Sequence, residues 1–244
     1  MKTKFLISCF AIIFTFSSCS IEEDEPQFDL TESLVAHYPL DGNTDDLSPY
    51  KVTAKRKGVR STFDRYGNAD LAYKFDGVND HIRVPASEHL SFTNEFTINL
   101  WLKTDTTNLQ QVLYKNISDT SKNRAAYGIS IGYVPFEDEE VVTKDIIFSI
   151  APYGIMHELR KFNYEKDRWY MITCTLKDDT MYLYINGKPA LMKYIKGEIS
   201  TSSTLPLLIG NDGSGEFPFK GSIDDIRIYN KAKSTEFVSH LYEQ

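Results

Sequence analysis

Carboxylates are the side chains of this sequence with the most potential for chemistry. The densest group is Glu137–Glu140, inside an acidic segment that runs from Pro135 to Thr143. No alternation of apolar residues accompanies it, so we expect a solvated loop or hairpin tip and not a rigid pair of catalytic acids. The sequence has no Gly-x-Ser-x-Gly, His-Glu-x-x-His or glycine-rich phosphate motif. Its five histidines are scattered, which argues against a histidine metal site.

Asp224 is a carboxylate in an otherwise apolar run. It has the same period-two parity as Ile226 and Ile228, which predicts that its side chain points toward the core. A buried carboxylate needs a partner, because an isolated one is costly to desolvate. The partner is either a metal ion or a basic side chain such as Arg227 or Arg83.

Exposed aromatic rings and planar polar groups are the usual tools of sugar recognition. Trp101 has the opposite parity to the apolar residues around it, so we expect it to face away from the main core. It is either packed there or displayed on an open sheet face. Tyr153, Asn211 and Asp212 fall in expected loops and are further candidates for ligand binding.

The charge balance limits the partners. The 244 residues include 27 basic and 34 acidic side chains, for a net charge of -7. Residues 1–18 contain two lysines and no acid, so a chain that starts at Cys19 has 25 basic and 34 acidic residues, or -9. We therefore expect no nucleic-acid partner, since that binding depends on neutralising phosphates with Lys and Arg.

The N-terminus has the pattern of a secretory signal. Lys2 and Lys4 precede an apolar run that is too short to span a bilayer, and small residues follow it. Residues 16–19, Phe-Ser-Ser-Cys, resemble the lipobox of bacterial lipoproteins. That resemblance implies a signal peptide at 1–18, lipidation of Cys19 and an outer-membrane lipid anchor. The alternative is a soluble secreted protein that is cut nearby.

Residues 19–31 are expected to form a linker, because the acidic run Glu22–Glu25 cannot pack. The run also resembles the export signal of surface lipoproteins in the Bacteroidetes, which implies a cell-surface location; a plain spacer is the alternative. Cys174 is then the remaining thiol. It lies in an expected strand, which favours a buried structural residue over a nucleophile.

Residues 32–244 read as one all-β domain. The runs Phe96–Leu102 and Met181–Ile185 alternate as half-buried strands do, and Asn186-Gly187 after the second is a strong hairpin signal. A short C-terminal helix is expected after Ser234, which is a good N-cap. Many short strands separated by turns predict a two-sheet antiparallel β-sandwich of the jelly-roll type. Further strands are expected at Leu34–Leu40, Ala72–Phe75, His81–Val84, Tyr127–Tyr133, Ile146–Ala151, Trp169–Leu176, Ala190–Ile195, Leu205–Ile209 and Ile223–Tyr229.

Six blocks of the domain form an ordered set: Ala36–Asn43 with Asp46, Tyr73–Pro85, Phe96–Lys103, Trp169–Thr173, Leu183–Lys188 and Phe219–Ala232. Together they resemble LamG-like jelly rolls of the concanavalin A-like lectin/glucanase superfamily. The resemblance implies a concanavalin A-like sandwich. It leaves the function open, because the fold carries lectins, enzymes and adhesion modules alike.

The resemblance also implies a structural Ca²⁺ site. Relatives bind calcium through an Asp of the closing strand and through the turn after the first strand. Carried onto this sequence, the ligands are Asp224, Asp41, the Gly42 carbonyl and Asn43, which are oxygen donors of the kind that Ca²⁺ prefers. Alternatively, Asp41 and Asn43 only cap a turn and Asp224 pairs with an arginine.

Three functions remain open at this stage. Glucanases of the superfamily resembling laminarinase carry a Glu-x-Asp-x-Glu strand, whereas here Val141 stands at the third position of the acidic cluster. The leading hypothesis is therefore a surface lipoprotein that binds a polysaccharide or host glycan without cleaving it. The alternatives are an adhesion or assembly subunit that binds protein, and a divergent glycoside hydrolase.

Overall fold

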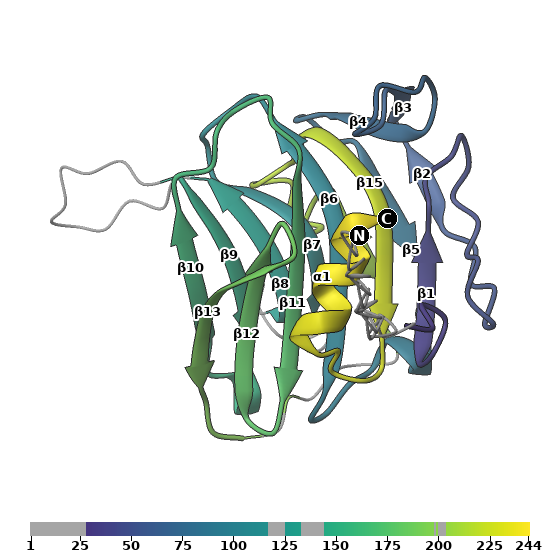
Figure 1. Cartoon of the computed structure of the whole chain (residues 1–244). Helices are drawn as coiled ribbons and strands as arrows, with labels where there is room; N and C mark the ends of the chain where they lie inside the picture. The colour runs from purple at the N-terminus through teal and green to yellow at the C-terminus, as the bar shows by residue number, and fades with distance from the viewer. Residues whose placement is uncertain (1–27, 117–124, 133–143, 198, 200–203) are drawn as a thin grey trace, which may run out of the picture.

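The computed structural model describes residues 28–116, 125–132, 144–197, 199 and 204–244. Two antiparallel sheets stack face to face, and one short helix lies against the outer side of one sheet (Figure 1). This arrangement confirms the predicted all-β sandwich with a C-terminal helix. Cys9 and Cys19, and the acidic segment that begins at Pro135, lie outside the described residues.

The first sheet has eight strands and includes both the first and the last strand of the domain. Its strands in spatial order are β13 (Lys188–Tyr194), β12 (Thr180–Ile185), β11 (Tyr170–Lys177), β6 (Phe96–Thr104), β15 (Lys220–Tyr229), β4 (Ala72–Asp76) and β3 (Arg60–Thr62). The eighth strand, β1 (Leu34–Tyr38), also pairs with β15.

The second sheet has seven strands. In spatial order they are β10 (His157–Phe162), β9 (Asp145–Ile150), β8 (Ala125–Gly132), β7 (Gln110–Asn116), β14 (Leu207–Ile209), β5 (His81–Val84) and β2 (Lys55–Lys57). Single 3-10 turns at Glu88–Leu90 and Pro152–Gly154 complete the description.

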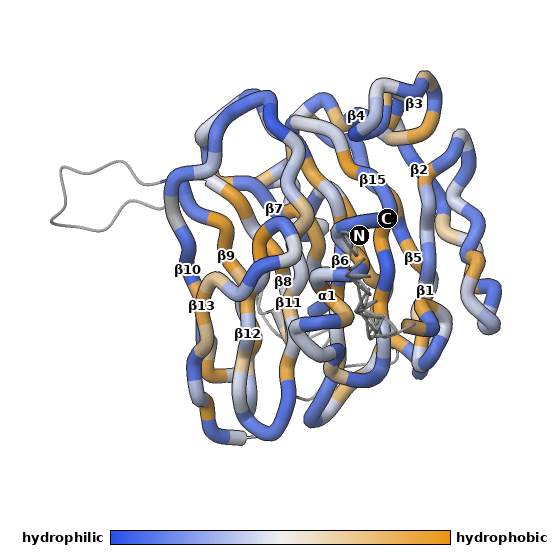
Figure 2. Tube along the Cα trace, viewed as in Figure 1, coloured by the Kyte–Doolittle hydropathy of each residue, from blue (hydrophilic) through white to orange (hydrophobic). Residues whose placement is uncertain are grey.

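The core lies between the sheets and follows from the alternation. Ile98 and Leu100 of β6 face Phe148 and Ile129 of the other sheet within one buried apolar cluster. Apolar and polar segments alternate along the strands in Figure 2, as expected for strands with one face in the core. Cys174 is fully buried in the same cluster, as predicted, and burial raises the pKa of its thiol.

Two local predictions are confirmed in detail. Asn186 and Gly187 form the two-residue turn of the β12–β13 hairpin, with φ of 50° and 76°. The helix α1 (Thr235–Glu243) begins after Ser234, whose hydroxyl accepts the Phe237 N–H at 3.2 Å. The hairpin turn and the helix start therefore form where the local sequence predicts them.

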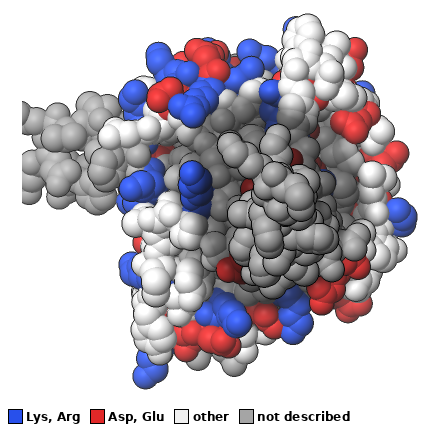
Figure 3. Space-filling model, in the orientation of Figure 1, with Lys and Arg blue, Asp and Glu red and all other residues white. Residues whose placement is uncertain are grey.

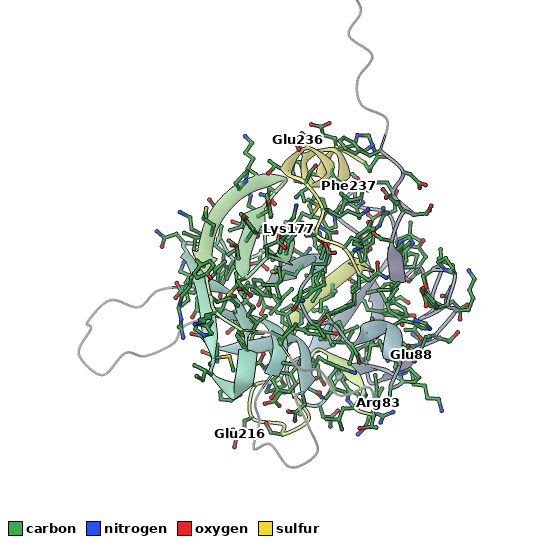
Figure 4. The ribbon with its side chains drawn as sticks, turned by 90° about the horizontal axis from the view of Figure 1, so that it is seen from below. Arg83, Glu88, Lys177, Glu216, Glu236 and Phe237 are labelled. Atoms are coloured by element: carbon green, nitrogen blue, oxygen red, sulfur yellow. The ribbon has the colours of Figure 1, made fainter. Side chains whose placement is uncertain are left out.

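Helix α1 closes over the outer face of the eight-stranded sheet. Figure 4 shows Phe237 directed toward the sheet and Glu236 away from it. Phe237, Val238 and Leu241 form a second buried apolar cluster with residues of the strands below. Phe28, where the described chain begins, packs edge-on against Phe237 at 5.7 Å, so the N-terminal segment enters the domain on the helix side. In the described part of the chain, no helix has the length and apolar character to cross a membrane.

Candidate functional site

A β-bulge in β15 places two neighbouring aspartates on the outer face of the eight-stranded sheet. Asp224 pairs with Trp101 of β6, while Arg227 pairs with Asn99, so the register shifts between Asp224 and Arg227. Asp225 has a left-handed φ of 43° at this point. The predicted inward direction of Asp224 is therefore wrong: a bulge adds one residue and reverses the parity that connects Asp224 to Ile226.

The two aspartates lie in a polar hollow of about 470 Å³. We call it the acidic hollow. Its walls come from the β15 bulge, from β1 and the turn after it, and from the loop between β3 and β4. Its lining includes His37, Asp41, Asp64, Arg65, Tyr66 and Asp225. Segments that are far apart in the sequence meet here because β15 pairs with both β1 and β4.

Basic side chains neutralise the aspartates of this hollow. Arg65 donates to Asp224 at 2.8 Å, and its other terminal nitrogen lies 3.8 Å from Asp225. Asp225 also contacts the Nε2 atom of His37 at 3.0 Å and accepts from Nε of Arg227 at 2.9 Å. The charged side chains of the hollow thus form a network of close contacts, which buried charges need because an unpaired one is costly to desolvate.

The network separates the acidities of the two neighbouring carboxyl groups. Burial raises the pKa of Asp224 to about 7, and the charge of Asp225 adds to the rise, while Arg65 opposes it. Burial would also raise the pKa of Asp225, but the hydrogen bond from His37 and the charge of Arg227 hold it below its usual value. Both carboxyl groups are nevertheless occupied by basic partners.

These residues do not fit the calcium site that the sequence predicted. Asp41 and Asp224 do line the same hollow, but the guanidinium of Arg65 takes the place beside Asp224 where a cation would bind. Gly42 and Asn43 are exposed, and Asn43 caps its own turn by accepting the Asp45 N–H at 2.8 Å. In the described chain no three His, Cys, Asp or Glu side chains are grouped to hold a metal. Calcium binding stays a prediction that this arrangement disfavours.

An aromatic ring stands at the opening of the acidic hollow. Tyr66 is 61% exposed, and the Arg65 guanidinium lies 4.5 Å from its ring centre. Asp64 holds the loop by accepting the backbone N–H groups of Tyr66 and Asn68 at 2.9 and 2.8 Å. A ring beside fixed carboxylates and guanidinium groups is the combination that can cover the C–H face of a sugar and bond its hydroxyls.

Comparison with known proteins identifies the family. Residues 76–239 match the Laminin_G_3 model of the concanavalin A-like lectin/glucanases superfamily. The chain belongs to this family.

Solved structures show the same fold. One is domain 4 of an extracellular GH43 arabinanase from Geobacillus stearothermophilus, solved with arabinotriose. It is 18% identical, with a TM-score of 0.67 over 86% of this chain and 98% of that one. Another is the ligand-binding domain of botulinum neurotoxin serotype D, solved with N-acetylneuraminic acid. It is 18% identical, with a TM-score of 0.65 over 87% of this chain and 51% of that one.

A curated relative is much longer than this concanavalin A-like chain. Adhesion G-protein coupled receptor V1 of Danio rerio is 23% identical over 153 residues, which are 61% of this chain and 2% of the receptor. The chain also spans only about half of the toxin binding domain. These likenesses establish the fold of the domain.

Trp101 faces away from the main core of the concanavalin A-like sandwich, as predicted, but it is covered. It is only 8% exposed, because Tyr242 of α1 stacks on it at 5.5 Å and Arg65 lies 4.7 Å from its ring centre. Its burial favours packing over ligand binding.

The other three predicted ligand residues lie on the seven-stranded sheet and are not brought together. Asn211 and Asp212 follow β14, where their carboxylate and amide oxygens accept the N–H groups of Ser214 and Gly213. Tyr153 lies in the turn after β9, at the opposite end of the sheet. Their roles in binding stay predictions, and the structure assembles no common site from them.

Sequence reasoning missed Asp64, Arg65 and Tyr66. Arg65 contacts Asp224 only in the folded sheet, because the two residues are 159 positions apart in the chain. The available signal was the run of charged and aromatic residues from Asp64 to Tyr66, directly before Gly67.

Proposed function

We propose that this chain is a lipid-anchored, non-catalytic module that binds glycans through the acidic hollow. The observation that carries the proposal is the exposed Tyr66 ring beside a prearranged network of carboxylate and guanidinium groups. A network that is already paired loses little conformational freedom when a ligand binds, which favours affinity. Sugar hydroxyls both donate and accept, so they suit a wall that presents both kinds of group.

The structural relatives support a carbohydrate ligand. The arabinanase domain was solved with arabinotriose, and the toxin domain with N-acetylneuraminic acid. Both share the sandwich at low identity, so they support the class of ligand and not a particular sugar. We infer a polysaccharide or host glycan as the partner.

Binding without cleavage follows from the state of the carboxylates. Asp224 and Asp225 share one hollow and their pKa values are driven apart, which is the pattern of an acid and a nucleophile in glycosidases. Here, however, Arg65 holds Asp224, while His37 and Arg227 hold Asp225. Carboxylates held in this way are poorly placed to transfer a proton or attack a sugar, so we do not assign a hydrolase.

The anchor rests on the N-terminal sequence. Cys19 is its attachment residue, and eight residues lie between it and Phe28. At about 3.5 Å per extended residue, this segment reaches roughly 30 Å. The domain would then be held close to the outer membrane, in reach of surface proteins that share its glycan. Metabolic labelling with a fatty-acid analogue tests this part; a Cys19→Ala variant labelled as strongly as the wild type would contradict it.

A glycan array with the full-length protein in detergent tests the binding proposal. Tyr66→Ala should weaken binding to the captured glycan by about tenfold, because the ring contact is lost. Tyr194→Ala is the matched control, since Tyr194 is similarly exposed at 67% but lies on β13, away from the hollow. Absence of binding to every glycan, or equal losses in both variants, would overturn the proposal.

A further inference from the structure

A second hollow, of about 490 Å³, lies on the outer side of β3 and β4. We call it the basic hollow. Its walls are strand residues together with the turns on either side: Arg60, Ser61, Thr62, Lys74, Asn79 and Asp80 are among them. The volume falls within the range of small-molecule sites in proteins. None of these residues lines the acidic hollow or was predicted as a site residue from the sequence.

Two cations face each other across this hollow. Arg60 of β3 is the direct cross-strand partner of Lys74 of β4, so the two side chains share one face of the sheet. Like charges placed directly opposite destabilise a sheet. Both residues are exposed, and neither has a carboxylate within 4.0 Å in the described chain. The two cations share the hollow with the carboxylates of Asp76 and Asp80, which also line it.

The carboxylates of the basic hollow serve the backbone. Asp80 accepts the backbone N–H of Asp76 at 2.9 Å, and Asp76 accepts that of Val78 at 2.8 Å. Gly58 allows this arrangement, because a Cβ atom there would lie 1.7 Å from the Asp80 carboxylate. The two acids therefore shape the turn, and neither lies within 4.0 Å of Arg60 or Lys74. Arg60 is still close enough for its charge to oppose the rise that burial causes in the pKa of Asp80.

Protection of a sheet edge does not explain the pair. Lysine and arginine on an edge strand prevent pairing with other chains, and this accounts for Arg60 on the edge strand β3. Lys74 lies on β4, which has β15 on one side and β3 on the other. Arg83 on the internal strand β5 faces the edge residue Lys55 in the same way, so strand position alone does not distinguish the two pairs. The Arg60–Lys74 pair differs because both of its side chains line a hollow that could hold a ligand.

We propose that the basic hollow binds the carboxylate or sulfate group of an acidic glycan. The fork of the Arg60 guanidinium suits bidentate contact with such a group, and Lys74 adds a second charge. Ser61, Thr62 and Asn79 supply hydroxyl and amide groups for the sugar hydroxyls. The inference rests on the proposed function for the rest of the glycan, and it narrows the ligand class to acidic sugars.

One hairpin carries both hollows. Its strands supply Arg60 and Lys74 to the basic hollow, and its loop supplies Arg65 and Tyr66 to the acidic hollow. A polysaccharide that follows the hairpin would present its ring faces to Tyr66 and its acidic groups to Arg60. Contacts at both hollows then act on one ligand and reinforce each other.

The test measures binding of the full-length protein to polygalacturonate and chondroitin sulfate, with neutral arabinan as the comparison. Arg60→Gln and Lys74→Gln should each weaken binding to the acidic polymers by about tenfold to a hundredfold, as expected for a lost charged hydrogen bond. Arabinan binding should not change. Melting temperatures of the variants at or above that of the wild type would show that they fold.

A matched pair of cations provides the control. Lys55 of β2 is directly opposite Arg83 of β5, both are exposed, and neither lines a described hollow. Figure 4 shows Arg83 on the side of the molecule opposite to α1. Lys55→Gln and Arg83→Gln should leave binding within about twofold of the wild type, since screening limits the reach of exposed charges to about 10 Å.

The outcomes separate the two proposals. Equal losses in the control pair, undiminished binding in Arg60→Gln and Lys74→Gln, or equal binding of single-stranded DNA would overturn the basic hollow as an acidic-sugar site. Binding of arabinan alone would overturn it too, and would leave glycan binding intact. No binding of any polymer would overturn both.

Discussion

The two hollows beside the β3–β4 hairpin differ in whether their basic side chains have carboxylate partners. In the acidic hollow, Arg65 lies 2.8 Å from Asp224, and Asp225 has contacts from His37 and Arg227. In the basic hollow, Arg60 faces Lys74 and neither has a carboxylate partner in the described chain. The cations of the first hollow thus have close carboxylate partners, whereas those of the second have none within 4.0 Å among the described residues and are the ones that we propose contact an anion.

The difference shows that the charges of the acidic hollow also stabilise the fold, whereas those of the basic hollow do not. The Arg65 network ties the hairpin to the β15 bulge and lies over Trp101, so it contributes to the fold. The Arg60–Lys74 pair opposes the fold slightly through repulsion. Figure 3 shows basic and acidic side chains interspersed over the visible face of the molecule. The two hollows differ in the partners of their cations.

Removing Arg65 should have the largest effect on stability. Arg65→Met removes the basic partner that lies 2.8 Å from the buried Asp224, while Asp225 keeps Arg227 and His37. We expect a loss of about 3–5 kcal/mol in the free energy of unfolding. Urea denaturation measures it. In the background of Arg65→Met, Asp224→Asn should restore part of the loss, because the uncompensated charge is gone. A loss below about 1 kcal/mol would show that the network does not hold the hairpin.

Lys115 is a buried cation with no carboxylate partner among the residues that the structure describes, and it extends the comparison. Lys115 of β7 is 0% exposed, and its amine donates to the Leu205 carbonyl. Burial lowers the pKa of Lys115 to about 8. Lys115→Met should stabilise the protein by about 1–3 kcal/mol near pH 7, since an unpaired buried charge is removed.

The same lysine makes stability depend on pH. Between pH 8 and about 10.4, the unfolded chain keeps the Lys115 proton and the folded chain has lost it. The unfolded state therefore binds more protons, and the free energy of unfolding rises with pH across this window. Urea titrations at several pH values should show this rise in the wild type and a smaller one in Lys115→Met. Parallel curves would contradict it.

Relieving the repulsion in the basic hollow should have a small effect of the opposite sign to that of Arg65→Met. Lys74→Gln should stabilise the unliganded protein by about 0.2–1 kcal/mol while weakening acidic glycans. Lys193→Gln is the control, because Lys193 is an exposed strand lysine opposite Met181. Destabilisation by Lys74→Gln alone would mean that this lysine has a structural partner.

Calcium should have the smallest effect. The Arg65 cation already occupies the place beside Asp224, so calcium or a chelator should leave the melting temperature unchanged. A metal present at a hundred times its Kd would add about 2.7 kcal/mol, which thermal denaturation would detect. A clear rise with calcium that is lost in Asp224→Ala would restore the metal site that the sequence predicted.

Most of the fold follows from local patterns in the sequence. The alternation in β6 and β12, the Asn186-Gly187 turn and the Ser234 cap each act over a few residues, so they are visible without the structure. Strands β2 and β3 were not predicted, because Lys55–Lys57 and Arg60–Thr62 have no apolar alternation. They form through pairing with β5 and β4.

The sites depend on long-range geometry that sequence periodicity does not contain. The bulge in β15 turned Asp224 to the other face of the sheet, and parity alone gives no sign of one extra residue. Helix α1 covers Trp101 from the far end of the chain. The predicted calcium ligands and Trp101 have suitable side chains for those roles. The sequence could not show which neighbours would surround them in the folded protein.

Titration calorimetry with the glycan that the array identifies tests the central claim most directly. Wild type and Tyr66→Ala are titrated with it, and its chain length is analysed after overnight incubation. The account predicts binding by the wild type, about tenfold weaker binding by Tyr66→Ala, and an unshortened glycan. Equal affinity of the two proteins, or a glycan cut by the wild type, would contradict it.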